Sequence, residues 1–173
     1  MTSIPLPRPV TVPNVLATNR SFSLFVLRLA LGVVVLPHGL QKVFGWYGGW
    51  GLDGTLGWFA SIGIPSFLGI LAIAADSLGA LAVIAGIGTR IAAFGIGVNM
   101  VVAALLVHRA NGFFMNWAGN QAGEGYEFHI LAAAIALAVV LGGAGRWSLD
   151  RLITSSNGQA GSPVRHRHAE SGA

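Results

Sequence analysis

Four apolar segments, each close to the length of a membrane-crossing helix, constrain this chain more than any other feature. They are residues 22–43, 66–87, 91–107 and 128–141, and glycine-rich or polar stretches separate them. A helix needs about 20 apolar residues to cross the hydrocarbon core of a bilayer. The fourth segment is short for a crossing unless it starts at Gly125 or continues to Gly145. Backbone groups in lipid must be hydrogen-bonded internally, which favours helices. We therefore expect an all-α integral membrane four-helix bundle.

The composition agrees with a protein whose main partner is the lipid bilayer. Hydrophobic residues make up 54% of the 173 residues and charged residues only 9%, where a soluble chain carries about 25% charged residues. The mean hydropathy is +0.69. The net charge of +4 does not indicate a nucleic-acid partner, because the arginines are scattered and form no basic stripe. The chain has no cysteine, which excludes dithiol and thiolate chemistry of its own.

The distribution of charge and proline predicts three parts and one orientation. Residues 1–20 hold four prolines and read as a disordered cytoplasmic tail, residues 21–153 as the four-span membrane domain, and residues 154–173 as a second disordered cytoplasmic tail. Eight of the ten basic residues fall on the side of the two termini and the turn at residues 86–90. Cytoplasmic loops carry the excess of lysine and arginine. We therefore expect both termini in the cytoplasm of a bacterium and the chain in its inner membrane.

Local signals mark the ends of the helices. Ser21 is placed to cap the first span, and Pro37 is expected to kink that span near its outer end. Apolar residues at helical spacing in residues 45–63 predict a short interfacial helix that Asp53 could cap, flanked by tryptophans. Pro65 is expected in the first turn of the second span.

Asp76 is the most informative polar residue, because it falls near the middle of the second span. A carboxyl group at the centre of a bilayer costs about 2.5–3.5 kcal/mol on insertion scales, so it normally faces the bundle and finds a partner. Arg28, in the inner half of the first span, is the expected partner. Two interpretations remain open, a buried ion pair that sets the register of the helices and a proton-relay or ligand site.

Further polar residues gather at the outer ends of the spans. Histidines and carboxylates there could move protons, cap helices or hydrogen-bond a quinone, but their spacing matches no known metal motif, so we predict no metal site. Within the spans, four other polar side chains could bind a ligand or bridge helices. The outer candidates are His108, Glu124, Glu127 and His129, and the buried polar candidates, with Arg28 and Asp76, are His38, Gln41, Lys42 and Asn99.

Six short motifs, taken in order, resemble those of the DoxX family. They are Arg28-Leu-Ala-Leu-Gly32, Pro37-His38-Gly39-x-Gln41-Lys42, Phe44-Gly45-Trp46, Gly86-x-Gly88-Thr89-Arg90, Asn111-Gly112-Phe113-Phe114 and Gly145-Arg146-Trp147-Ser148-Leu149-Asp150. The resemblance covers residues 22–153 and implies a four-helix membrane protein. Members of that family often carry a glutamate in the second span, where this chain has the shorter Asp76.

For function, the resemblance implies the membrane subunit or anchor of a redox system that is quinone-linked or related to oxidative stress. Such a subunit would work with a soluble partner, an oxidoreductase or a sulfurtransferase, and would take quinone as its candidate cofactor. Two alternatives remain open, a non-catalytic membrane scaffold or assembly factor and a small carrier that would function as a homo-oligomer. Whether the chain is itself an enzyme is also open at this point.

Overall fold

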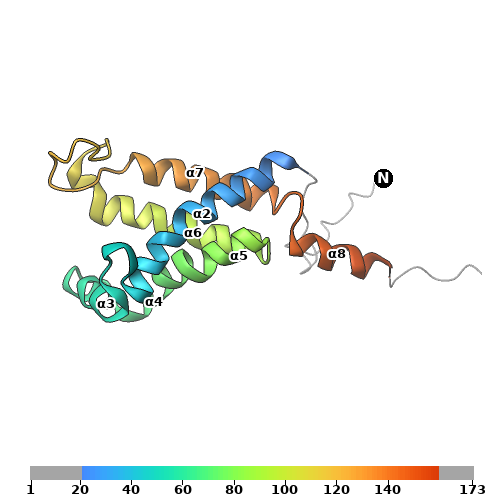
Figure 1. The fold of residues 1–173 in the computed structure, drawn as a ribbon, viewed down its shortest axis with the longest axis horizontal. Helices are drawn as coiled ribbons and strands as arrows, with labels where there is room; N and C mark the ends of the chain where they lie inside the picture. The colour runs from blue at the N-terminus through green and yellow to red at the C-terminus, as the bar shows by residue number, and fades with distance from the viewer. Residues whose placement is uncertain (1–20, 160–173) are drawn as a thin grey trace, which may run out of the picture.

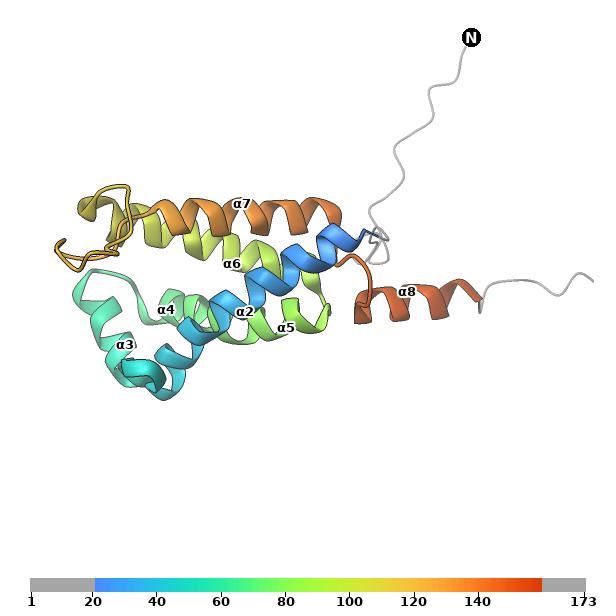
Figure 2. The same ribbon diagram turned by 45° about the horizontal axis from the view of Figure 1, so that its top comes forward.

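The computed structural model describes residues 21–159, which form a bundle of α-helices without a β-strand in that range. Figures 1 and 2 show the long helices side by side, with α8 extending from one end of the bundle. The predicted all-α fold is therefore confirmed. In chain order the elements are α2 (Phe22–Phe44), the 3-10 turn η1 (Trp46–Gly48), α3 (Gly51–Ser61), α4 (Ser66–Ala74), the π-helical turn η2 (Ala75–Gly79), α5 (Ala80–Ala85), α6 (Thr89–Ala103), the π-helical turn η3 (Ala104–His108), the 3-10 turn η4 (Arg109–Asn111), α7 (Glu127–Gly142) and α8 (Leu149–Gln159).

The first span begins and ends at residues suited to those positions. The Ser21 hydroxyl accepts a hydrogen bond from the Leu24 N–H at 3.3 Å, so the predicted N-cap is confirmed. The helix continues through Pro37 to Phe44. It stops at Gly45, which has a φ of 72° and whose N–H donates to the Gln41 carbonyl at 3.1 Å. Glycine adopts this left-handed conformation without the strain that a side chain would bring.

The second and third spans form an antiparallel hairpin. Segments α4, η2 and α5 make one continuous helix over Ser66–Ala85, and η2 introduces a π-helical turn at its centre. The turn to α6 passes through Gly86 and Gly88, with φ angles of 72° and 54°. Two residues with positive φ so close together are tolerated because both are glycine.

The fourth helix is shorter than the other three. Within the described residues, three helices are long and apolar enough to cross a membrane, Phe22–Phe44, Ser66–Ala85 and Thr89–Asn111. Helix α7 is apolar but has 16 residues, so it is about 24 Å long, less than the hydrocarbon thickness of about 30 Å. It packs along α6 and α2 and completes the bundle. A fourth full crossing stays a prediction, as does the orientation of the termini.

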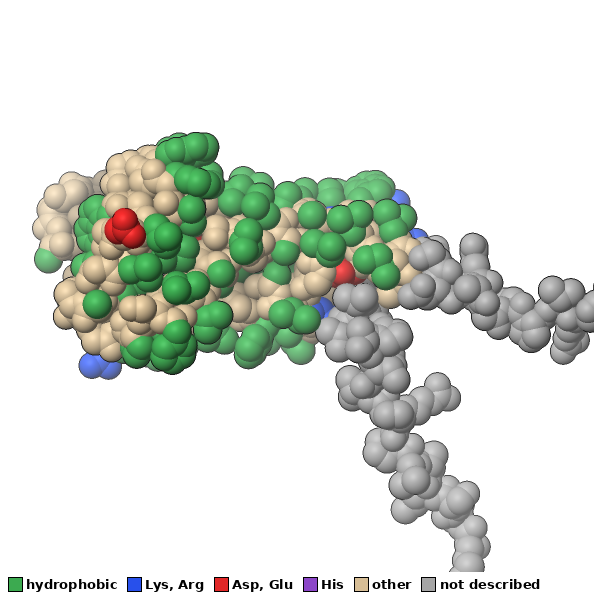
Figure 3. Space-filling model, turned by 90° about the horizontal axis from the view of Figure 1, so that it is seen from below, with side chains coloured by type: hydrophobic (Ala, Val, Ile, Leu, Met, Phe, Trp, Pro, Cys, Tyr) green, Lys and Arg blue, Asp and Glu red, His purple; other side chains and the backbone are tan. Residues whose placement is uncertain are grey.

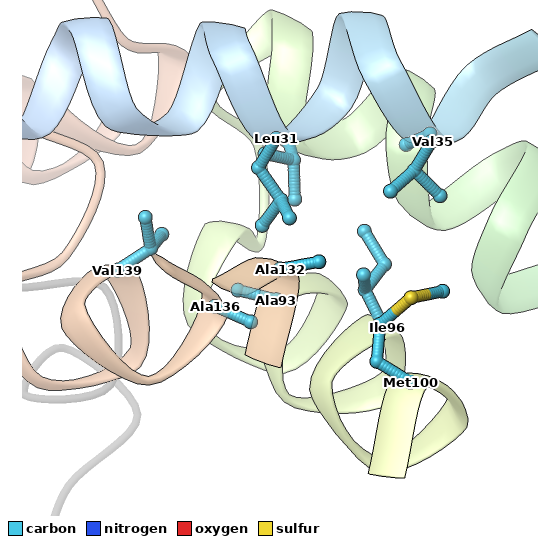
Figure 4. Packing of buried hydrophobic residues seen from close by; sticks show 10 residues of the cluster. Leu31, Val35, Ala93, Ile96, Met100, Ala132, Ala136 and Val139 are labelled. Atoms are coloured by element: carbon cyan, nitrogen blue, oxygen red, sulfur yellow. The ribbon is translucent and has the colours of Figure 1, made fainter. Parts of the chain in front are cut away.

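Apolar side chains from four helices, α2, α5, α6 and α7, make the core of the bundle. Figure 4 shows Leu31 and Val35 of α2 pointing toward Ile96 of α6 and Ala132 of α7. Small residues allow α6 and α7 to approach closely. A Cβ at Gly97 would lie 3.2 Å from the Cβ of Ala136. Close packing of small residues is a main source of helix association in membranes, where burial of apolar surface adds little.

The outside of the bundle is apolar along its length. Figure 3 shows hydrophobic side chains covering the length of one face, and charged side chains toward its two ends. Large apolar residues stay exposed on all four helices, among them Phe67, Phe94, Leu106 and Leu137. This surface fits a protein embedded in lipid.

The two ends of the bundle are built differently, and we name them by their residues. The terminal end holds Ser21, residues 86–89 and residues 143–150, where the described chain starts and α8 begins. The loop end holds residues 45–65 and residues 109–126.

Three predicted boundaries change. Asp53 lies in the first turn of α3 but does not cap it, because the N-cap residue is Trp50 and no side chain makes a cap hydrogen bond. Pro65 is the N-cap residue of α4 and so precedes its first turn. Helix α8 continues to Gln159, past the start of the predicted tail at residue 154. The predicted tails at residues 1–20 and 160–173 lie outside the described residues.

Candidate functional site

Asp76 lies at the centre of the polar cluster in the membrane domain. Its side chain is completely buried, and its carboxylate forms an ion pair with the Lys42 ammonium group. The second carboxylate oxygen accepts a hydrogen bond from the Asn99 side-chain amide at 2.8 Å. Lys42 is 28% exposed. The network therefore leads from the buried interior of the bundle to its surface.

Helix α2 approaches Asp76 so closely because residue 39 is glycine. A Cβ at Gly39 would overlap the Asp76 carbonyl group and the Cα of Ser77. The two backbones therefore touch at this point, and Lys42, three residues further along α2, extends over Asp76. Residues at i and i+3 lie on the same side of a helix. Asp76 itself sits in the π-helical turn η2, a local geometry that often occurs at functional sites.

The predicted pairing of Asp76 with Arg28 is wrong. The Arg28 guanidinium lies at the terminal end, where it donates to the carbonyl oxygens of Val83 and Ala144, both at 2.8 Å, and of Trp147 at 2.6 Å. It also bonds the Ile84 carbonyl and reaches the Arg146 carbonyl at 3.4 Å. Arg28 therefore takes up the free carbonyl groups at the end of α5 and in the segment after α7. Its role in this structure is to hold helix ends together.

Two further charged residues at the terminal end bind backbone in the same way. The Asp150 carboxylate accepts hydrogen bonds from the N–H groups of Gly88 at 2.7 Å and Thr89 at 2.9 Å, at the start of α6. Arg90 donates to the carbonyls of Val140 and Leu141, the latter at 2.8 Å, at the end of α7. Each charge has the sign that stabilises the helix end it binds. Neither residue was a candidate from the sequence, where both resembled charges at the membrane surface.

The three histidines of the described chain meet at the loop end. The rings of His108 and His129 stack with centroids 4.0 Å apart, and the His38 ring lies 5.9 Å from that of Phe128, the residue before His129. His38 interacts electrostatically with Lys42, Asp76 and His108, and His129 with His108, His38 and Lys42. The histidines therefore belong to the same cluster as the ion pair. His38 is exposed, whereas His129 is buried.

The two glutamates have a structural role in the loop between α6 and α7. The Glu124 carboxylate accepts from the Asn116 N–H at 2.7 Å, and the Glu127 carboxylate accepts from the Met115 N–H at 2.9 Å. The His108 Nδ1–H donates to the Glu124 carbonyl at 2.9 Å. These contacts fold the loop back on itself, and both carboxylates bind backbone groups of the loop.

The remaining candidate, Gln41, forms its hydrogen bond with the segment after α2 and not with the ion pair. Its side-chain amide donates to the Tyr47 carbonyl at 3.2 Å on the exposed side of α2. Among the described residues, no group of three or more histidine and carboxylate side chains could hold a metal ion. The cluster that emerges joins Lys42, Asp76 and Asn99 to the three histidines, without Arg28 or Gln41.

Comparison with known proteins adds the family. A family model named DoxX matches residues 23–109, just over half of the chain. This chain belongs to the DoxX family. Searches of curated proteins and of solved structures find no significant match. The matched segment holds α2 through η3, and therefore Lys42, Asp76 and Asn99 together.

The DoxX motifs separate in space into the two ends of the bundle. Within the matched segment, Pro37–Lys42 lies on the loop side and contributes Gly39 and Lys42 to the cluster around Asp76. Arg28 and the Gly86–Arg90 turn lie at the terminal end. The Gly145–Asp150 motif, outside the matched residues, packs on that turn, since the Asp150 N–H donates to the Gly86 carbonyl at 2.8 Å. The motifs at the terminal end thus hold helix ends together, and the Pro37–Lys42 motif contacts a buried carboxylate.

Proposed function

We propose that this DoxX protein is the membrane subunit of a quinone-linked redox system that works with a soluble partner. One observation carries the proposal. A fully buried carboxylate is paired with a lysine that is 28% exposed, and an exposed histidine stands four residues before that lysine on α2. Ionisable groups are expensive inside a membrane, and those that lead from the interior to the surface commonly belong to proton or substrate paths.

The chemistry of quinone reduction suits these groups. A quinone that becomes a quinol gains two electrons and two protons, one proton on each carbonyl oxygen. In the proposal, His38 and Lys42 would hold the ring oxygens by hydrogen bonds, and each could supply one of the two protons. Asp76 orients Lys42 through the ion pair, and Asn99 orients the Asp76 carboxylate through a hydrogen bond. The two electrons would come from a reduced substrate that the soluble partner, an oxidoreductase or a sulfurtransferase, delivers and that is oxidised in the reaction.

A photoreactive quinone analogue tests the site directly. The full-length protein in lipid nanodiscs is illuminated with the analogue, digested and analysed by mass spectrometry. We expect labelling of the α2 peptide that contains His38 and Lys42. Asp76→Asn should lower the labelling about tenfold, because Lys42 loses the partner that orients it, and a hydrogen bond to a charged group is worth about 1.5–3 kcal/mol.

Asp53→Asn is the matched control, since it removes an exposed carboxylate from α3 at the same end of the bundle. It should label like the unmodified protein. Equal labelling of the Asp76→Asn and unmodified proteins, or labelling spread evenly over all helices, would contradict the proposal. Purification of the tagged chain from native membranes, followed by identification of bound proteins, tests for the soluble partner.

A non-catalytic scaffold is the second candidate, and the terminal end favours it. There Arg28, Arg90 and Asp150 all bind backbone groups of the chain itself. If the polar residues around Asp76 likewise only hold the helices together, the Asp76–Lys42 pair sets the register of α2 against η2 and does nothing more. This candidate predicts that a deletion strain is rescued as well by Asp76→Asn as by the unmodified gene, and that a partner co-purifies with either form.

A further inference from the structure

The loop end also contains a cleft that the redox proposal does not use. It lies between α6–η3 and α7 and has a volume of about 840 Å³, within the range of about 300–1,000 Å³ that is usual for small-molecule sites. Val101 and Leu105 of one helix and Ala133 of the other form its apolar walls, and these continue into the apolar outer surface of the bundle.

The polarity of the cleft changes along its length. Arg109 and Tyr126 stand at the loop end, just outside the two helices, and line its mouth. His129 follows, one turn into the membrane domain. Because α6 and α7 run antiparallel, the apolar residues Val101 and Ala133 come deepest. The order along the cleft is therefore cation, hydrogen-bonding group and apolar wall.

Two polar groups of the cleft have no partner within the part of the chain that the structure describes. His129 is only 8% exposed, and its buried Nδ1 makes no hydrogen bond. Buried polar atoms are nearly always hydrogen-bonded in native structures, so an exception calls for an explanation. The Arg109 side chain is exposed, and no described residue forms a hydrogen bond or an ion pair with its guanidinium group.

We propose that this cleft binds one molecule of an acidic glycerophospholipid. The phosphate of the lipid pairs with Arg109 at the mouth, the ester groups lie beside Tyr126 and His129, and the acyl chain lies along Val101, Leu105 and Ala133. A glycerophospholipid carries its charge, its esters and its hydrocarbon in this same order. Arginine is suited to the contact because its planar guanidinium matches the phosphate oxygens.

Native mass spectrometry of the full-length protein measures the binding. The protein is released from nanodiscs that contain equal amounts of phosphatidylglycerol and phosphatidylcholine, and the retained lipids are counted. We expect one phosphatidylglycerol to be retained in preference to phosphatidylcholine. Arg109→Gln should lower that preference about tenfold, because it removes a charge-assisted contact. Arg146→Gln, an exposed arginine at the terminal end, is the matched control and should leave the preference unchanged.

A second pair of variants tests the apolar part without touching a charge. Ala133→Phe fills the cleft and should remove the retained lipid, whereas Ala134→Phe, on the exposed side of the same helix, should not. Equal loss in the Arg109→Gln and Arg146→Gln proteins, or full retention in Ala133→Phe, would overturn the proposal. So would a neutral quinone analogue that displaces the lipid and binds the Arg109→Gln protein undiminished, because that result would assign the cleft to a quinone.

Discussion

The two ends of this bundle use charged residues in opposite ways. At the terminal end, Arg28 and Asp150 are buried and bind backbone carbonyl and N–H groups of neighbouring helix ends. Between the centre of the bundle and the loop end, Asp76 is buried but binds side chains, and its partner Lys42 extends toward the surface. Backbone groups cannot change their charge or leave, whereas side chains can exchange protons and move. Buried charge alone therefore does not identify a functional site, and the chemical nature of its partner is more informative.

The largest effect on stability should come from Arg28. Arg28→Leu leaves several buried carbonyl groups without a donor, and we expect the free energy of unfolding to fall by about 3 kcal/mol or more. Unfolding in mixed micelles, followed by circular dichroism, measures the change. Arg28→Lys keeps the positive charge but not the planar guanidinium group with its several donors. Its free energy of unfolding should therefore fall by less than that of Arg28→Leu. A loss below 1 kcal/mol in Arg28→Leu would mean that the terminal end is not held together by this residue.

The contact between α2 and η2 should give the next largest effect. Gly39→Ala places a methyl group on the Asp76 carbonyl, and overpacking of this kind costs about 1–3 kcal/mol. Gly57→Ala is the control, since a Cβ there meets no atom within 4 Å, and alanine should stabilise the interior of α3 by up to about 1 kcal/mol. Both values come from the same unfolding experiment. Equal changes in the two variants would contradict the close approach at Gly39.

Asp150→Asn should have a moderate effect. The amide keeps one acceptor oxygen for the start of α6 but loses the negative charge that favours a helix N-terminus. We expect a loss of about 1 kcal/mol in unfolding free energy. Quinone labelling of α2 should stay unchanged, because Asp150 lies at the opposite end of the bundle. A loss of labelling without a loss of stability would show that the terminal end influences the proposed quinone site.

Gln41→Ala should have the smallest effect. Its one hydrogen bond, to the Tyr47 carbonyl, is exposed, and surface changes usually stay within about 0.5 kcal/mol. Labelling by the quinone analogue should also stay the same, although Lys42 is the next residue. A large loss of labelling in this variant would show that the quinone contacts the outer side of α2 and would move the proposed site.

The helical architecture could be predicted from the sequence. The lengths of the apolar segments and the glycines between them mark directly where each span begins and ends. The Ser21 cap and the Gly86–Gly88 turn are local features and were found. The partner of Asp76 could not be found by counting residues along each span. It depends on how α2 crosses the second helix, and that crossing is set by the contact at Gly39. A glycine inside a helix signals such an approach, and with it Lys42 becomes the nearest cation.

Asp150 and the cleft were missed for a related reason. The carboxylate of Asp150 reaches Gly88 and Thr89, more than sixty residues earlier in the chain, and only the packed bundle shows that it is buried. Arg109, Tyr126 and His129 come from two helix ends and have no recognisable spacing. Long-range arrangements of this kind carry no local sequence signal.

A double-mutant cycle measures whether the buried Asp76 carboxylate is coupled to Lys42. Asp76→Asn and Lys42→Met are combined, and the unfolding free energies of the single and double variants give the coupling energy. We predict a coupling of about 1 kcal/mol or more between residues 76 and 42. The parallel cycle of Asp76→Asn with Arg28→Lys should be additive within about 0.5 kcal/mol. Additive effects with Lys42→Met, together with coupling to Arg28→Lys, would contradict the pairing of Asp76 with Lys42.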